Sequence, residues 1–166
     1  MNIQKSPLTA VLIFFATATT PVASFAEDEA ANPDFALSPK LHQLLRAEMN
    51  ELSGGIKSLA HSLAIADWKA IEQTSEKMHG SYIMKQSLTP AQAMELKQTL
   101  PHQFKQLDAA FHARAKKLHQ AAVAKDAELA AFHYFRLVDG CIGCHAAFAT
   151  HRFPGFTQHP EERHEH

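Results

Sequence analysis

Two cysteines and a histidine lie together near the C-terminal end of the chain, in the run Gly140 to His145 (GCIGCH). Cys141 and Cys144 are three positions apart, and His145 follows at once. On a helix, positions i, i+3 and i+4 share one face, so both thiols and the imidazole can reach the same flat group. This spacing is the attachment pattern of a c-type haem: each thiol adds to one vinyl group, and the histidine is the proximal ligand of the iron.

The two cysteines allow other interpretations. One is a structural disulfide between Cys141 and Cys144, and another is a redox dithiol of the thioredoxin type, which requires a βαβ pattern around the motif. The residues before the motif have helical periodicity instead, and a zinc site needs more ligands at ligand-like spacing. The chain contains no other cysteine, and it starts with an export signal. We therefore predict covalent attachment of one haem c.

The N-terminus has the features of a secretory signal peptide. Lys5 gives a weakly basic start, residues 8–20 (LTAVLIFFATATT) form a short apolar run, and Ser24 and Ala26 place small residues at the −3 and −1 positions of a cleavage site. The pattern predicts a signal peptide over residues 1–26 and a periplasmic mature protein. The alternative is an uncleaved anchor, although the run is short for a membrane span. Elsewhere no stretch is long and apolar enough to span a membrane.

Composition limits the domain count and the partners. The 166 residues suffice for one ordinary domain plus the N-terminal segment. The formal net charge of −1 argues against nucleic-acid binding, which needs a basic face. The 12 histidines are scattered, and most are predicted to face solvent. The spacing does not decide which way His133 faces.

Long amphipathic segments with recognisable starts make up the rest of the chain. Ser38 and Pro39 suit the N-cap and the first position of a first helix. Asp67 suits the N-cap of a second helix, and Asp126 suits that of the last. Pro101 suits the start of the third long helix, and Thr89 with Pro90 suits the start of a short helix before it.

Apolar residues at alternating spacings of four and three define the inward side of each long helix. Gly54 and Gly55 interrupt the first helix, where each glycine costs about 1 kcal/mol. Either a flat group or another backbone comes close there, or the helix has a mild kink. The predicted inward residues are Leu41, Leu45, Met49, Leu52, Ile56, Leu59 and Leu63 in the first helix, Trp68, Ile71, Ser75, Met78 and Tyr82 in the second, Phe104, Leu107, Phe111, Ala115, Leu118 and Ala122 in the third, and Leu129, Phe132, Phe135, Val138, Cys141, His145 and Phe148 in the last.

These segments predict an all-α fold, because strand-like alternation is absent from the sequence. Four long helices joined mostly by short turns predict an antiparallel four-helix bundle, with an extra short helix in the connection between the second and third helices. The predicted divisions are a signal peptide (1–26), a disordered leader (27–37), the bundle domain (38–153) and a flexible His-rich tail (154–166).

Four amphipathic helices with Cys141, Cys144 and His145 in the last one resemble the cytochrome c-prime family. Members of this family are periplasmic four-helix bundles with one covalent haem near the C-terminus. The resemblance covers about residues 38–153, and only the haem motif is specific. The chain departs from the family at Ala149, where a basic residue is usual, and in the longer segment of residues 81–100.

The resemblance also implies a distal residue on the first helix, opposite the proximal histidine. Met49 has that placement, and a thioether there would be a sixth ligand to the iron that raises the haem potential. The alternative is that Met49 only fills the core, as methionines usually do. Met78 and Met84 are weaker rivals for the distal position. Arg46, one turn before Met49, could pair with a haem propionate, and the alternative is a solvated side chain.

Together these inferences predict a non-enzymatic protein that transfers single electrons in the periplasm. The alternative function, also implied by the resemblance, is a five-coordinate haem protein that binds nitric oxide or carbon monoxide. A haem peroxidase would need a distal acid–base pair, which the first helix does not offer. The expected partners are redox proteins. The sequence does not decide whether small gas ligands or a second copy of the chain also bind.

Overall fold

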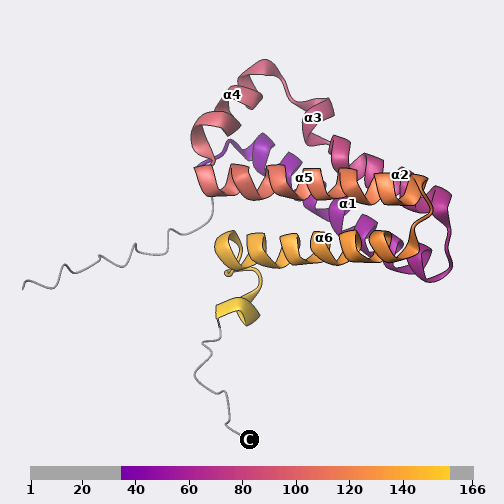
Figure 1. The fold of residues 1–166 in the computed structure, drawn as a ribbon. Helices are drawn as coiled ribbons and strands as arrows, with labels where there is room; N and C mark the ends of the chain where they lie inside the picture. Colours follow the sequence, from indigo (N-terminus) through magenta and orange to yellow (C-terminus); the bar gives the residue numbers. More distant parts are fainter. Residues whose placement is uncertain (1–34, 158–166) are drawn as a thin grey trace, which may run out of the picture. The chain divides into compact units, whose positions relative to one another are not determined.

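The computed structural model describes residues 35–157, and this part of the chain is entirely helical, with no strand. The predicted signal peptide lies outside the described residues. Among the described helices, none is long and apolar enough to cross a membrane. The elements, shown in Figure 1, are α1 (Pro39–Ala64), α2 (Trp68–Gly80), α3 (Met84–Ser87), α4 (Pro90–Thr99), α5 (His102–Val123), α6 (Ala127–Phe148) and the 3₁₀ helix η1 (Pro154–Thr157).

Aspartate caps begin α2 and α6, as the sequence predicts. The Asp67 carboxylate accepts a hydrogen bond from the Ala70 N–H at 3.1 Å. The Asp126 carboxylate accepts one from the Leu129 N–H at 2.9 Å. Each cap satisfies a backbone donor that has no partner within its own helix. The short turns before α2 and α6 are therefore determined largely by local sequence.

The connection between α2 and α5 contains two helices instead of the single one predicted. The second of them, α4, begins with a capping box, in which the Thr89 hydroxyl accepts from the Gln92 N–H and the Gln92 side chain accepts from the Thr89 N–H. Ser38 occupies the N-cap position of α1, but its side chain makes no cap hydrogen bond. Its backbone N–H instead donates to the Glu95 carboxylate of α4. Contacts between distant segments thus complete this end of α1.

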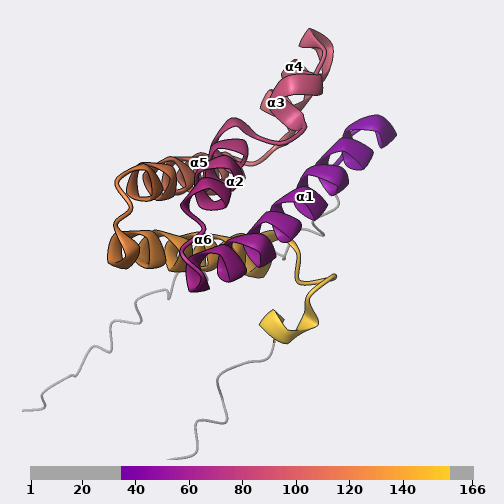
Figure 2. The same ribbon diagram turned by 90° about the vertical axis from the view of Figure 1, so that its right-hand side faces the viewer.

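The core lies where α5 packs against α2 on one side and against α6 on the other, and α1 contacts both α2 and α6. Figure 2 shows α1 crossing α6 obliquely, with its N-terminal half directed away from α6 and towards α3 and α4. The buried core residues are Leu59 of α1, Ile71 and Met78 of α2, Phe111, Ala115, Leu118, Ala121 and Ala122 of α5, and Ala130 and Leu137 of α6.

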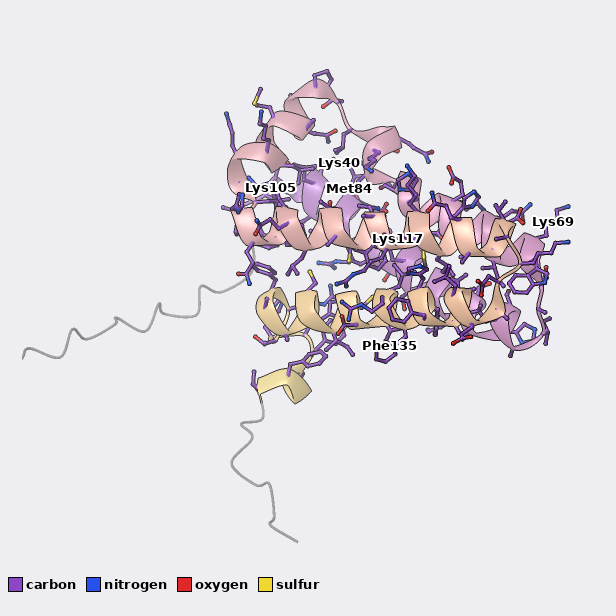
Figure 3. All side chains as sticks on the ribbon, in the orientation of Figure 1. Lys40, Lys69, Met84, Lys105, Lys117 and Phe135 are labelled. Carbon is purple, nitrogen blue, oxygen red and sulfur yellow. The ribbon has the colours of Figure 1, made fainter. Side chains whose placement is uncertain are left out.

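The predicted inward side of α6 is wrong over its first half. Leu129, Phe132 and Phe135 are exposed, and Figure 3 shows Phe135 on the outer side of α6. The buried residues are Ala130 and Leu137. The physical reason is the alanine-rich surface of α5: small side chains let two helices approach closely, so an alanine fits where a phenylalanine would not. The large apolar residues therefore stay outside.

The predicted inward side of α1 is partly wrong as well. Leu41 and Leu59 are fully buried, as predicted. The other buried positions of this helix are Glu48, Gly55 and Ser62, which the sequence pattern does not select. The buried face is therefore centred beside the predicted one, and the residues on the flank of that face are only half-buried: Leu45, Met49, Leu52, Ile56 and Leu63.

Both ends of the predicted domain extend further than the sequence suggests. Phe35 and Leu37 belong to the predicted disordered leader, yet Leu37 is buried and the Phe35 ring packs against other aromatic rings. At the other end, residues 154–157 form η1 instead of the start of a flexible tail. The rest of the His-rich tail, residues 158–166, lies outside the described residues.

Candidate haem attachment site

The last turns of α6 carry the cysteine–histidine motif. Both cysteines are free thiols and half-buried. Burial raises the pKa of the Cys141 thiol. Burial, with smaller contributions from Asp108 and Cys141, raises the pKa of Cys144 to about 11. Both sulfurs are therefore protonated at neutral pH, whereas a redox dithiol would need a lowered thiol pKa.

His145 lies beside the two thiols on the same helix. Its ring stacks on the ring of Phe153, with centroids 4.4 Å apart and an interplanar angle of 20°. Burial, followed by the charge of Arg152, lowers the pKa of His145. The imidazole is therefore neutral at pH 7, and a neutral ring nitrogen is the form that binds a metal.

A polar cluster supports the turn of α6 that precedes the motif. The Arg114 guanidinium of α5 donates to the Arg136 carbonyl at 3.0 Å and lies 3.7 Å from the Asp139 carboxylate. Asp139 also pairs with the Arg136 side chain at 3.1 Å. A Cβ atom at Gly140 would lie 3.0 Å from Arg114 Nη1 and 3.4 Å from Phe111. Glycine thus lets α5 and its arginine come close to α6 just before Cys141.

An aromatic cluster follows the motif at the C-terminal end of α6. Phe148 lies 5.9 Å from Phe35 and 5.5 Å from Phe104, and Phe35 lies 5.1 Å from Phe104, all between ring centroids. These separations are typical of favourable aromatic pairs. The cluster fixes the end of α6 against the start of α5 and against the segment before α1. Phe35 is missed by sequence reasoning because it lies outside any periodic pattern.

The two candidate residues of α1 lie on a different helix from the motif. Met49 is half-buried and Arg46 is exposed. A groove of about 450 Å³ runs along this part of α1 and is lined by Pro39, His42, Gln43 and Arg46. It is an open groove lined by residues of α1 alone. No residue of α6 lines the groove, so it provides room beside α1 without connecting Arg46 directly to the cysteine motif.

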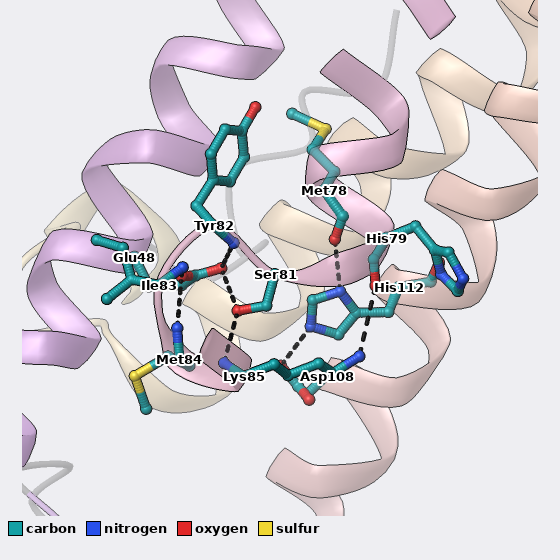
Figure 4. Close-up of polar contacts among 10 residues, drawn as sticks. All are labelled: Glu48, Met78, His79, Ser81, Tyr82, Ile83, Met84, Lys85, Asp108 and His112. Carbon is teal, nitrogen blue, oxygen red and sulfur yellow. Dashed lines mark hydrogen bonds and ion pairs between the residues drawn. The ribbon is translucent and has the colours of Figure 1, made fainter. Parts of the chain in front are cut away.

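Glu48 of α1 forms a buried polar contact that the sequence analysis did not predict. Its carboxylate is buried and accepts four hydrogen bonds, shown in Figure 4. The donors are the Ser81 hydroxyl at 2.9 Å and the backbone N–H groups of Tyr82 at 2.9 Å, Ile83 at 2.6 Å and Met84 at 3.1 Å. The only signal in the sequence is the spacing of seven residues from Leu41, which places the two on one face of a helix.

Half-buried histidines join α2 to α5, although the sequence suggests surface positions. His112 Nδ1 lies 2.6 Å from the Met78 carbonyl oxygen, and its Nε2 lies 3.4 Å from the Asp108 carboxylate. His79 Nδ1 lies 3.2 Å from the His112 carbonyl oxygen. His133 of α6 is also half-buried, and burial and Lys117 lower its pKa. The rings of His79 and His112 therefore act as polar links between α2 and α5.

The alternatives for the two thiols lose support from this geometry. Within residues 35–157, no three His, Cys, Asp or Glu side chains form a group that could hold a metal ion, so a zinc site lacks a ligand set there. The motif lies on a helix and the described chain has no βαβ unit, contrary to the thioredoxin pattern.

No family model, no curated protein and no solved structure matches this chain.

Proposed function

We propose that this protein is a periplasmic monohaem c-type cytochrome that transfers single electrons. The observation that carries the proposal is the placement of Cys141, Cys144 and His145 at positions i, i+3 and i+4 of one helix, with both thiols free and the imidazole neutral. The finer fold proposal is an antiparallel four-helix bundle of α1, α2, α5 and α6, which the pairwise contacts of these helices support. The resemblance to the cytochrome c-prime family agrees with both proposals.

The donor set fits a haem c. Cys141 and Cys144 would each form a thioether with one vinyl group, and His145 would bind the iron on the proximal side. Met49 would provide the sixth ligand, and Arg46 would pair with a propionate. When bound, the haem would supply an iron that can accept one electron from a reduced partner protein and pass it to an oxidised one.

The side chains around the motif would perform the remaining tasks. Phe153 covers one face of the His145 ring and limits its contact with water. Arg114 and Phe111 hold the turn of α6 before Cys141. A Met49 thioether would close the distal side and keep the ligand set unchanged between oxidation states, which suits an electron carrier.

A second candidate function is the binding of nitric oxide or carbon monoxide at an open distal site. The observation that favours it is the direction of the N-terminal half of α1, which extends away from α6 (Figure 2). Met49 is only half-buried there. If this methionine does not reach the iron, a gas molecule can occupy the sixth position.

Mass spectrometry of the periplasmic fraction tests attachment and export together. The expected mass equals residues 27–166 plus one haem, and the colour stays with the protein after extraction with acidic acetone. The C141A/C144A double variant should lose this colour. His145→Ala should change the spectrum of the iron, whereas His133→Ala, a matched change on the same helix, should not. Colour lost completely to the solvent contradicts the proposal.

The Met49→Leu variant separates the two functions. If Met49 is the sixth ligand, the wild-type spectrum is low-spin, and the variant becomes high-spin and binds carbon monoxide. Met94→Leu is the control, because Met94 is exposed on α4, and Met84→Leu tests the rival ligand. A wild-type protein that is already high-spin and takes up carbon monoxide supports gas binding instead.

A further inference from the structure

Glu48 is a buried carboxylate that holds a distant part of the chain. Only 3% of its surface is exposed, and its four donors belong to the hydroxyl of Ser81 and to three successive backbone N–H groups, those of Tyr82, Ile83 and Met84. A buried carboxylate is costly unless its oxygens are fully hydrogen-bonded, and here they are. One side chain of α1 therefore fixes the connection from α2 to α3 (Figure 4).

The N-terminal half of α1 has few other anchors. Before Gly55, Leu41 is the only fully buried residue of this helix besides Glu48. The Glu95 carboxylate of α4 holds the very start through the Ser38 N–H. Besides the apolar contacts of Leu41 and Leu52, these polar contacts thus help to determine the rotation of this half of α1 about its own axis.

Met49 follows Glu48 directly, so its direction depends on that rotation. Successive residues of an α-helix project about 100° apart, because a turn contains 3.6 residues. With Glu48 held against the segment 81–84, the side chain of Met49 is set on the half-buried flank of α1, together with Leu45 and Leu52. If α1 turned, both side chains would leave these positions together.

We infer that Glu48 is the positioning residue that holds Met49 towards the haem iron, an inference that rests on the proposed function. Ser81 has a φ of 65°, a left-handed value that a residue other than glycine rarely adopts. The four hydrogen bonds to Glu48 offset this unfavourable backbone conformation, because they satisfy the donors that it presents. The connection from α2 to α3 and the N-terminal half of α1 therefore stabilise each other.

The experiment compares Glu48→Gln with Glu51→Gln in the haem-loaded protein. Both variants remove one carboxylate from α1, but Glu51 is exposed. A glutamine at position 48 keeps the shape and can accept at only one of its two former oxygens. We expect Glu48→Gln to shift the low-spin spectrum towards a mixture with high-spin iron and to allow carbon monoxide to bind. Glu51→Gln should keep the wild-type spectrum.

Amide hydrogen exchange gives a readout that does not depend on the haem. Glu48→Gln should speed up exchange at Tyr82, Ile83 and Met84, whereas Glu51→Gln should leave it unchanged. If Glu48→Gln does not fold, Ser81→Ala removes a single donor and should give a smaller shift in the same direction. The core variant Leu59→Ala should lower stability without changing the spin state.

The outcomes separate this inference from the proposed function. If Met49→Leu is high-spin but Glu48→Gln and Ser81→Ala keep the low-spin spectrum, Met49 remains the ligand and the role of Glu48 is overturned. If Leu59→Ala changes the spin state as much as Glu48→Gln does, Glu48 acts only through general stability, and the inference again fails. A high-spin wild-type protein overturns the role of Met49, and that of Glu48 with it.

Discussion

Burial shifts the pKa values of the neighbours Cys144 and His145 in opposite directions, and in both cases it favours the neutral form. Burial raises the pKa of the thiol and lowers that of the imidazole. A nearby positive charge such as Arg152 disfavours an imidazolium further. The motif therefore presents an unionised thiol and a neutral ring nitrogen in one half-buried place, and the neutral nitrogen is the form that binds a metal.

The pKa of His112 is raised, in contrast to that of His145, and this shift makes stability depend on pH. The hydrogen bond from its ring to Asp108 is the main cause that raises its pKa above the ordinary 6.5, and burial and Lys85 oppose this effect. Its second nitrogen lies 2.6 Å from the Met78 carbonyl, so the charged ring can donate on both sides.

We predict that the stabilisation from His112 is fully present below pH 6.5 and is lost as pH rises through its raised folded-state pKa. The measurement is the free energy of unfolding from pH 5 to pH 9 for wild type and His112→Gln. The difference between the two proteins should shrink as pH rises. Asp108→Asn should weaken the same trend. A difference that stays constant or grows with pH contradicts the prediction.

At the scale of elements, the two glycines of α1 have different surroundings. A Cβ atom at Gly55 would lie 2.5 Å from Met78 Cε and 2.7 Å from Tyr82 Oη, whereas a Cβ atom at Gly54 would have no neighbour within 4 Å. The side chains of Met78 in α2 and of Tyr82, just after α2, therefore make the close approach, which the sequence suggested for a flat group or a backbone. Only one glycine of the pair permits close packing.

We predict opposite effects for alanine at the two positions. Gly54→Ala should stabilise the protein by about 1 kcal/mol, because alanine has the higher helix propensity. Gly55→Ala should destabilise it by about 1–3 kcal/mol, because Met78 and Tyr82 must shift away. Chemical denaturation of both variants measures the effects. Equal effects at the two positions would show that α1 and α2 do not pack as described.

At the scale of the whole molecule, the packing around the bundle includes residues that precede α1. Leu37 is 7% exposed, and Phe35 contacts Phe104 and Phe148. The residues just before α1 thus cover the end of α6, the helix that carries the motif.

We predict that a protein starting at Ser38 is less stable than one starting at Glu27 by about 2–4 kcal/mol. Burial of one large apolar side chain contributes about 1.5–3 kcal/mol, and Phe35 is only partly covered. Thermal unfolding of the two proteins measures the difference. Equal stability of the two proteins would contradict the packing described for Phe35 and Leu37.

Features that depend on neighbours along the chain could be predicted from the sequence. The caps at Asp67, Asp126 and Thr89 were predictable because a side chain reaches a backbone N–H two or three residues ahead. The all-helical fold followed from apolar spacing. The placement of Cys141, Cys144 and His145 on one helical face followed from the geometry of a single turn.

The side of each helix that is covered, and the residues that cover it, depend on contacts between distant segments and could not be predicted from the sequence. Alternating apolar residues show that a helix has an apolar side, but the size of the partner's side chains determines where contact is closest, as Ala130 and Phe135 illustrate. The partners of Glu48 and Phe35 lie more than thirty residues away along the chain. Such contacts arise from the crossing of whole helices, which no local pattern of residues encodes.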